Sequence, residues 1–405
     1  MALRPEKSEQ FRLQDFLPAA QESGNTMAAF TTSGLPLLKP ILCTYNPHPE
    51  FRFLYPKIGA FSFLRKNGPL NYQNSIEIKP SWLGTPWPTS FPVARQCRHW
   101  EAGLEAGKEL LLELRRFSSD DDRKLPSGLF VSEDPDKLSV KGLRAVENAT
   151  NAGIYMNPGA SKNRMRLLVK SLLAFWLHDD VVETHPEQAG YTAIDEGTAQ
   201  WSEIIRDSSI RPSATSLHAA ELIEEDPDLG RELMQCMLYW FDAMRQTPRT
   251  SFTGLRDFLD YRTVDIAAPA ILAFVRFANE TRLSTAENDD LRPFLALAVD
   301  HVILVNDFYS YEKEKRDFET GRCTFIVNTV HYLGESLSVE PSTAKSVALQ
   351  LLAELEGQLG KELTRLRDSD SLNETQLKYA CAVLEMVAGN LFYSMSAPRY
   401  GEVRK

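Results

Sequence analysis

Three side chains that carry oxygen recur at every fourth position in the C-terminal half of the chain: Asn306, Ser310 and Glu314. In a helix this spacing places them on one face, where they continue an apolar stripe. Two neutral oxygens and one carboxylate suit a hard cation, and Mg²⁺ in particular keeps waters and takes phosphate oxygens to complete its coordination. The pattern indicates a magnesium site that a phosphorylated ligand completes; a solvated helix end is the alternative.

A second apolar stripe also ends in acidic residues: Asp179, Asp180 and Glu183. Phe175 and Trp176 lie one turn before them and are candidates to line an apolar cavity, although packing in the core is the alternative for any single aromatic residue. Acidic helix ends are common, so this segment alone equally suits the surface. The metal-site interpretation of this segment is supported by the other helix, whose stripe also changes from apolar to metal-compatible side chains.

Helical periodicity begins near residue 96 and continues toward the C-terminus. The clearest amphipathic segments are 96–117, 160–184, 228–247, 252–279, 284–315, 342–368 and 373–396. We therefore expect an all-α domain over residues 96–405, with helices packed around a central space. Pro269 should break the segment 252–279, because proline cannot donate a hydrogen bond to the carbonyl four residues earlier.

Residues 1–95 contain roughly half of the 23 prolines and should form few long helices. Aromatic residues such as Phe53, Trp82 and Trp87 predict that this proline-rich segment packs on the helical domain. A partly disordered arm is the alternative, because the segment lacks regular periodicity.

The composition restricts the possible partners and compartments. A net charge of −10 argues against nucleic-acid binding, so the cations that bind an anionic ligand must be local. Five scattered cysteines without CxxC spacing predict reduced thiols, with neither a zinc site nor a disulfide framework. The chain has no apolar run long enough to span a membrane and no secretory leader, so we expect a cytoplasmic protein.

Residues 178–183 resemble the aspartate-rich motif of class I terpene cyclases, and residues 306–314 resemble the NDxxSxxKE motif of the same family. Arg262, which lies 44 positions before Asn306, is similar to the arginine that senses diphosphate in these cyclases. Arg399 and Tyr400 resemble their C-terminal RY pair. The similarity extends over residues 179–400, and the proline-rich leader resembles that of some fungal sesquiterpene cyclases.

This resemblance implies a class I terpenoid synthase helical bundle around a central active-site cavity. It implies that three Mg²⁺ ions assist the ionisation of an isoprenyl diphosphate, and that the carbocation then closes into a terpene. The expected substrate is farnesyl diphosphate, and the expected product is a sesquiterpene hydrocarbon or alcohol. The oligomeric state, monomer or homodimer, stays open.

The resemblance also assigns roles to single residues. Asp179 would bind two Mg²⁺ ions, and Asp180 and Glu183 would orient the metal shell. The second motif would bind the third ion through its three oxygen-bearing residues, Asn306, Ser310 and Glu314. The diphosphate would be held by four side chains, Arg262, Lys313, Arg399 and Tyr400.

The break near Pro269 acquires a possible role from the same resemblance. The family uses a comparable break to direct a backbone carbonyl at the substrate. Ile266 would take this position here, and Asp265 would link it to Arg262. A kink without a catalytic role is the alternative.

Other activities remain open at the level of sequence. A diterpene cyclase acting on geranylgeranyl diphosphate would carry the same motifs. A chain-elongating prenyl transferase would share the fold and metals, but it usually has aspartate-rich motifs on both helices. His178 and Asp179 also resemble the metal-binding pair of HD phosphohydrolases, and a noncatalytic helical scaffold is a further possibility.

Overall fold

The computed structural model describes residues 38–401, with gaps at 42–43, 52–54, 66–67, 71, 80–83, 85, 118–124, 132–133, 185–192, 208, 211–215, 247 and 369–371. Residues 39–405 form one compact unit, to which the elements below belong. Phe53 and Trp82 lie outside the described residues, and so does the side chain of Glu183.

The described residues are mainly helical, which confirms the predicted all-α class. The helices are α1 (Trp100–Phe117), α2 (Val140–Met156), α3 (Lys162–Thr184), α4 (Ala193–Arg206), α5 (Leu217–Glu225), α6 (Pro227–Met244), α7 (Leu255–Asp265), α8 (Ala268–Asn279), α9 (Thr285–Asp290), α10 (Arg292–Glu319), α11 (Thr329–Leu337), α12 (Pro341–Asp368) and α13 (Glu374–Ser396). Two short antiparallel pairs accompany them, β1 (Ser75–Ile78) with β2 (Ala94–Cys97) and β3 (Phe130–Val131) with β4 (Asp134–Leu138).

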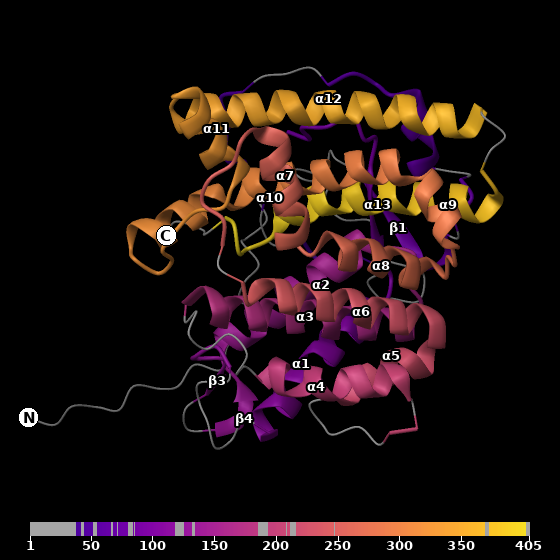
Figure 1. Cartoon of the computed structure of the whole chain (residues 1–405), viewed down its shortest axis with the longest axis vertical. Coiled ribbons are helices and arrows are strands. Elements are labelled where there is room, and N and C mark those ends of the chain that lie inside the picture. The colour runs from indigo at the N-terminus through magenta and orange to yellow at the C-terminus, as the bar shows by residue number, and fades with distance from the viewer. Residues whose placement is uncertain are drawn as a thin grey trace, which may run out of the picture. The chain divides into compact units, whose positions relative to one another are not determined.

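Helix α13 lies at the centre of this unit. Every residue from Tyr379 to Ser396 is buried, which is expected of a helix that is covered on all sides. Helix α10 packs along it, with α12 on the outer side of α10, while α2 packs on α13 and on α3 (Figure 1). Of the two helices that carry the predicted motifs, α10 therefore packs directly on α13, whereas α3 packs on α2, which lies against α13.

Two of the predicted helical segments are interrupted. The segment 284–315 was wrong as a single helix, because α9 ends at Asp290 and α10 begins at Arg292, with a proline in its first turn. Proline is tolerated there because the first helical N–H groups have no partner within the helix. The predicted break near Pro269 is confirmed: α7 ends at Asp265, and Ala267 has a left-handed φ of 59° before α8 begins.

The described part of the proline-rich segment contacts the central helices. Glu356 on α12 is fully buried and accepts hydrogen bonds from the Thr89 hydroxyl and, at 2.6 Å, from the Ser90 N–H. The Tyr45 N–H donates to the carbonyl of Met395 at the end of α13 (2.7 Å). The boundary that we predict near residue 95 between this segment and the helical domain stays a prediction.

Candidate active site

The oxygen-bearing residues of α10 meet a side chain from the loop that follows this helix. The Asn328 amide donates to Ser310 Oγ (3.3 Å) and to Glu314 Oε2 (3.0 Å), and it also reaches the carbonyl of Asp307 (2.8 Å). Asn328 is the N-cap of α11, where its Oδ1 accepts from the Val330 N–H. One amide thus fixes both the start of α11 and the orientation of two predicted metal ligands.

The electrostatics of Glu314 fit a cation. Burial, followed by the nearby negative charge of Asp307, raises the pKa of Glu314 to about 7. A partly buried carboxylate beside a like charge is costly unless a cation compensates it, and the charge of Arg262 does so only in part. The donor set around it consists of oxygens, which are the ligands that Mg²⁺ prefers. The residues present therefore suit the Mg²⁺ ions that the resemblance implies.

Arg262 connects α7 to the motif of α10 through ionic contacts. Its guanidinium is buried, and it pairs with Asp265 and with Asp307, while its Nη2 lies 3.5 Å from Asn306 Oδ1. Asp307 is held in turn by the N–H (2.7 Å) and hydroxyl (2.6 Å) of Thr329. Burial opposes the charge of Arg262, but the two neighbouring carboxylates more than offset it and raise its pKa.

The break between α7 and α8 changes the hydrogen bonding of the backbone carbonyls at Asp265 and Ile266. The carbonyl of Asp265 accepts from Trp240 Nε1 (2.9 Å), and the Ile266 N–H donates to the carbonyl of Arg262 (3.0 Å). Within the described part of the chain, no hydrogen bond reaches the carbonyl of Ile266. Arg262, Asp265 and the carbonyl of Ile266 therefore lie within one turn of each other, at the end of α7 and in the break that follows it.

The C-terminal segment connects the two motif helices. Asn306 Nδ2 donates to the hydroxyl of Tyr400 (3.1 Å), so Tyr400 lies against α10. The neighbouring Arg399 reaches α3, where its Nη2 lies 3.5 Å from Asp180 Oδ1 and 4.0 Å from Asp179 Oδ2. Two adjacent residues thus span the distance between the motifs, and the C-terminal end of α3 and the middle of α10 converge on one region.

Lys313 lies within the motif of α10, whereas Arg262 precedes this motif in the sequence. Its amine pairs with Asp317, one turn later, at 3.2 Å. The charge of Lys313 also lowers the pKa of Tyr400, although burial is the largest effect and raises that pKa overall. This coupling places Lys313 near the C-terminal pair.

The two predicted cavity aromatics differ in their surroundings. Phe175 is buried in an aromatic cluster, with ring centroids 4.7 Å from Trp240 and 5.5 Å from Phe241. Trp176 lines a cavity of about 160 Å³ between α2 and α3, together with Asp180 and Arg399. Its ring also stacks on Tyr393 at 6.1 Å. Trp176 therefore lies beside the acidic motif, whereas Phe175 packs in the core.

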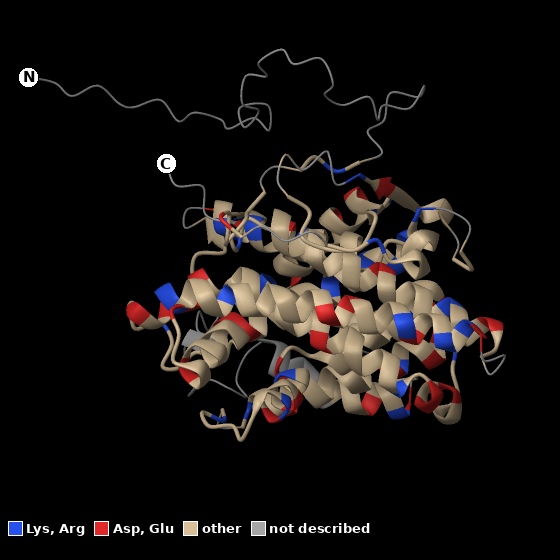
Figure 2. Cartoon of the chain, turned by 90° about the horizontal axis from the view of Figure 1, so that it is seen from above, with Lys and Arg blue, Asp and Glu red and all other residues tan. Residues whose placement is uncertain are grey.

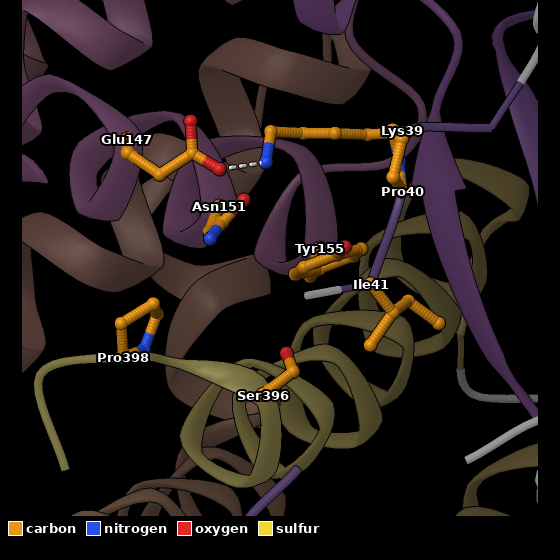
Figure 3. Close-up of a pocket in the computed structure, with 8 residues that line it drawn as sticks. All are labelled: Lys39, Pro40, Ile41, Glu147, Asn151, Tyr155, Ser396 and Pro398. Atoms are coloured by element: carbon orange, nitrogen blue, oxygen red, sulfur yellow. Dashed lines mark hydrogen bonds and ion pairs between the residues drawn. The ribbon is translucent and has the colours of Figure 1, made fainter. Parts of the chain in front are cut away.

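A small gap beside the C-terminal segment shows how this segment is held (Figure 3). Lys39 is almost fully buried and pairs with Glu147 on α2. Ser396 and Pro398 lie on the other side of the same gap. The N-terminal and C-terminal parts of the unit thus meet on one face of α2, next to Arg399.

Two residues of the site were not singled out from the sequence. Asp307 belongs to the second motif, and its charge within an apolar stripe was a signal for a buried ion pair. Asn328 follows Glu314 by 14 positions and has no regular spacing to the motif. Only the turn from α10 into α11 brings it back to Ser310 and Glu314.

Acidic and basic residues are interspersed along the helices seen in Figure 2, so an anionic ligand must find its cations at individual positions. Among the described residues, no helix is both long and apolar enough to cross a lipid bilayer.

His178 is buried against Trp240 and Phe241, with ring centroids at 5.7 and 4.8 Å. The described residues contain no cluster of three or more histidine, cysteine or acidic side chains able to hold a metal.

Comparison with known proteins agrees with this arrangement. The family model described as terpene synthase family 2, C-terminal metal binding, matches residues 170–357. Terpene cyclase 6 of Gibberella fujikuroi is 29% identical over 366 residues, which cover 90% of this chain and 95% of that protein. Terpene cyclase aneC of Aspergillus aculeatus is 32% identical over 337 residues, covering 82% of this chain and 74% of that protein.

Among solved structures, aristolochene synthase from Penicillium roqueforti superposes with a TM-score of 0.53 at 21% identity, covering 71% of this chain and 94% of that one. This likeness concerns the fold, which is the all-α fold predicted from the sequence. The identity to terpene cyclases over most of the chain, together with the metal-binding family match across both motifs, shows that the chain belongs to the class I terpene cyclases.

Proposed function

We propose that this terpene cyclase converts farnesyl diphosphate, with Mg²⁺, into a sesquiterpene hydrocarbon or alcohol and diphosphate. The observation that carries the proposal is the bridge formed by Arg399 and Tyr400 between Asp179–Asp180 on α3 and Asn306 on α10. A substrate diphosphate held at this bridge would contact metal ligands from both helices. Such convergence is what ionisation of the C–O bond requires, because the leaving group gains negative charge.

The ligands that we propose for the metal are Asp179, Asn306, Ser310 and Glu314, with Asp180 and Glu183 orienting the shell. Three ions are expected by resemblance to the family. When bound, Mg²⁺ supplies Lewis acidity that neutralises the charge of the departing diphosphate. Asn328 keeps Ser310 and Glu314 in place before the ligand arrives.

The diphosphate itself is proposed to contact Arg262, Lys313, Arg399 and Tyr400. Arg262 is preorganised, because Asp265 and Asp307 fix its guanidinium from two sides. A donor fixed in this way needs little reorganisation when the C–O bond breaks. Arg262 therefore connects diphosphate binding to the break between α7 and α8.

After ionisation, the carbocation must be stabilised and kept from water. The carbonyl of Ile266 is proposed to direct its dipole at the cation, in the role inferred from the family. The face of Trp176 can add a cation–π contribution of about 0.5 to 2 kcal/mol. Phe175 is proposed to support this wall from behind, through its packing on Trp240 and Phe241.

The choice of farnesyl diphosphate rests on the resemblance of the sequence to fungal sesquiterpene cyclases. A diterpene cyclase acting on geranylgeranyl diphosphate is the second candidate. A cyclopiane-type diterpene synthase of Penicillium chrysogenum is 23% identical over 257 residues, but this chain covers 33% of its length. The aristolochene synthase of Aspergillus terreus is 24% identical, and the chain covers 78% of that protein.

Two other activities have less support. Chain elongation usually requires aspartate-rich motifs on both helices, whereas the motif on α10 is built from Asn306, Ser310 and Glu314. An HD phosphohydrolase would need His178 as a metal ligand, but its ring packs among aromatic residues of the core. A cytoplasmic enzyme without a nucleic-acid partner agrees with the free thiols of the described cysteines, and it remains a proposal.

The test is incubation of the purified protein with Mg²⁺ and, separately, with geranyl, farnesyl or geranylgeranyl diphosphate. Gas chromatography should detect volatile products with fifteen carbons from farnesyl diphosphate. Products with twenty carbons alone would replace the proposed substrate. Longer soluble diphosphates formed with added isopentenyl diphosphate would overturn cyclisation in favour of elongation.

A further inference from the structure

The cavity of about 160 Å³ between α2 and α3 has two regular walls. Lys141, Arg144 and Asn148 line it at spacings of three and four residues, so they share one face of α2. Trp176 and Asp180 line it from the facing side of α3. An engineered cavity of roughly 150 Å³ holds a benzene molecule, so this space accommodates a group of a few heavy atoms.

The charge of this cavity is opposite to that of the chain. Three cations line it, Lys141, Arg144 and Arg399, against the single carboxylate of Asp180. The chain as a whole carries a net charge of −10, so a local excess of cations is not what its composition favours. Such an excess raises the local concentration of anions.

The charges of the two cations on α2 are not balanced by ion pairs among the described residues. Lys141 donates to the carbonyl of Ser127 (2.7 Å), and no carboxylate of the described residues pairs with either Lys141 or Arg144. Both residues are exposed and lie near the N-terminus of α2, whose first turn has no acidic residue. Cations at this end oppose the helix dipole, which makes them mildly destabilising.

The remaining wall residues define the chemistry of the ligand. Asn148 Oδ1 is buried and has no hydrogen-bond partner, and its amide can instead turn its NH₂ group toward an anion. Leu173, Trp176 and Leu177 make the α3 wall largely apolar. A ligand with an anionic head and a hydrocarbon part fits both walls.

We propose that Lys141 and Arg144, with Arg399, form a binding site that holds the diphosphate group of the isoprenyl substrate without metal. The inference rests on the proposed function and adds residues of α2 to it. Arg399 belongs to both places, because it lines the cavity and lies 3.5 Å from Asp180. The diphosphate would bind here first, beside the acidic motif, before the metal-bound complex forms.

The test is calorimetric titration of the full chain in EDTA, with inorganic diphosphate in one arm and farnesyl thiolodiphosphate in the other. Both should bind to the wild type, and the prenylated ligand should bind more tightly because of the apolar wall. Arg144→Gln should weaken both by about tenfold, because a charge-assisted hydrogen bond is lost. Arg144→Lys keeps the charge and should retain most of the affinity.

Arg166→Gln is the matched control, because Arg166 is a partly exposed arginine of α3 that pairs with Glu109 (2.7 Å) away from the cavity. Its affinity should equal that of the wild type. Absence of diphosphate binding in EDTA, or equal binding by Arg144→Gln and wild type, would overturn the site. Terpene formation with Mg²⁺ in the same preparation would then leave the proposed function standing, whereas its absence would contradict that function separately.

Discussion

At the scale of single residues, Asn328 combines two roles: it caps a helix and it orients two proposed metal ligands. One amide donates to Ser310 and Glu314, and its oxygen caps α11. Residues that orient metal ligands typically contribute about 10- to 100-fold to metal affinity or activity. Asn328 therefore links the start of α11 to the orientation of two proposed metal ligands, Ser310 and Glu314.

We expect Asn328→Ala to lower the apparent affinity for Mg²⁺ by about 10- to 100-fold, and to cost about 1 kcal/mol of stability through the lost cap. The measurement is the Mg²⁺ dependence of turnover, together with urea unfolding. Asn373→Ala is the control, because Asn373 caps α13 and forms its hydrogen bonds with Gln376 and Glu287, which lie outside the motif. It should lower stability similarly and leave the Mg²⁺ dependence unchanged; a parallel loss in both variants would contradict a role in metal binding.

Asp307 is buried between the Arg262 guanidinium and Thr329, and its loss leaves Arg262 with one carboxylate in contact, Asp265. Asp307→Asn should destabilise the protein by about 1–3 kcal/mol, measured by urea unfolding. Asp289→Asn removes an exposed pair with Arg292 and should change stability by less than about 0.5 kcal/mol. If both substitutions lower the free energy of unfolding equally, the buried pair of Arg262 and Asp307 contributes no more to stability than an exposed pair.

Glu385 on α13 should make stability depend on pH. Burial raises its pKa to about 7, although Arg95 lies 3.5 Å away and opposes the rise. The unfolded chain releases this proton near its usual pKa of 4.5. Between these values the native state binds more protons, so the free energy of unfolding falls as pH rises, by on the order of 1–3 kcal/mol.

Glu385→Gln removes the titrating group and should flatten this dependence. Urea unfolding at several pH values between 4.5 and 7 measures it in both proteins. An unchanged slope in the variant would assign the pH dependence to other groups.

At the scale of elements, the sequence predicted those helices whose apolar stripes are long and regular. The segments 160–184, 342–368 and 373–396 correspond closely to α3, α12 and α13. Helix α2 was not among the clearest segments, because glycine and asparagine interrupt its pattern, and its packing on α3 and α13 stabilises it instead. Helices α4 and α5 were not among them either.

The same distinction applies to the site. Asp179, Asn306, Ser310 and Glu314 could be proposed as metal ligands because each continues the apolar stripe of its own helix. The bridge between them could not, because it depends on where residues 397–401 cross the ends of α3 and α10. Contacts between segments distant in sequence are set by tertiary packing, which periodicity does not report.

The N-terminal segment stabilises this crossing from the other side. Lys39 pairs with Glu147, and the Tyr45 backbone bonds to Met395, just before Arg399. Lys39→Ala should therefore let the C-terminal pair shift and lower turnover by on the order of tenfold to a hundredfold, since small misplacements are costly in catalysis. Steady-state kinetics with the isoprenyl diphosphate substrate measures this effect.

Lys108→Ala is the matched control, because Lys108 forms an exposed pair with Glu105 on α1. Its turnover should equal that of the wild type. If Lys39→Ala also leaves turnover unchanged, the N-terminal segment does not position Arg399 and Tyr400.

At the scale of the whole molecule, we propose that this acidic chain binds its anionic substrate through a few cations gathered at one place. Arg262 comes from α7, Lys313 from α10 and Arg399 from the C-terminal segment, and none of them is close to another in sequence. The fold brings Arg262 against the middle of α10 and Arg399 against the acidic motif of α3, and Lys313 lies on α10 itself. Activity should therefore depend on the convergence of both motifs, and not on either helix alone.

A double-mutant cycle measures this convergence most directly. Turnover of farnesyl diphosphate with Mg²⁺ is compared among wild type, Asp179→Asn, Asn306→Ala and the double variant. Groups that act as a unit give strongly non-additive effects, so each single variant should lose most activity and the double variant little more. Full activity in either single variant, or losses that multiply independently, would contradict a shared metal–diphosphate site.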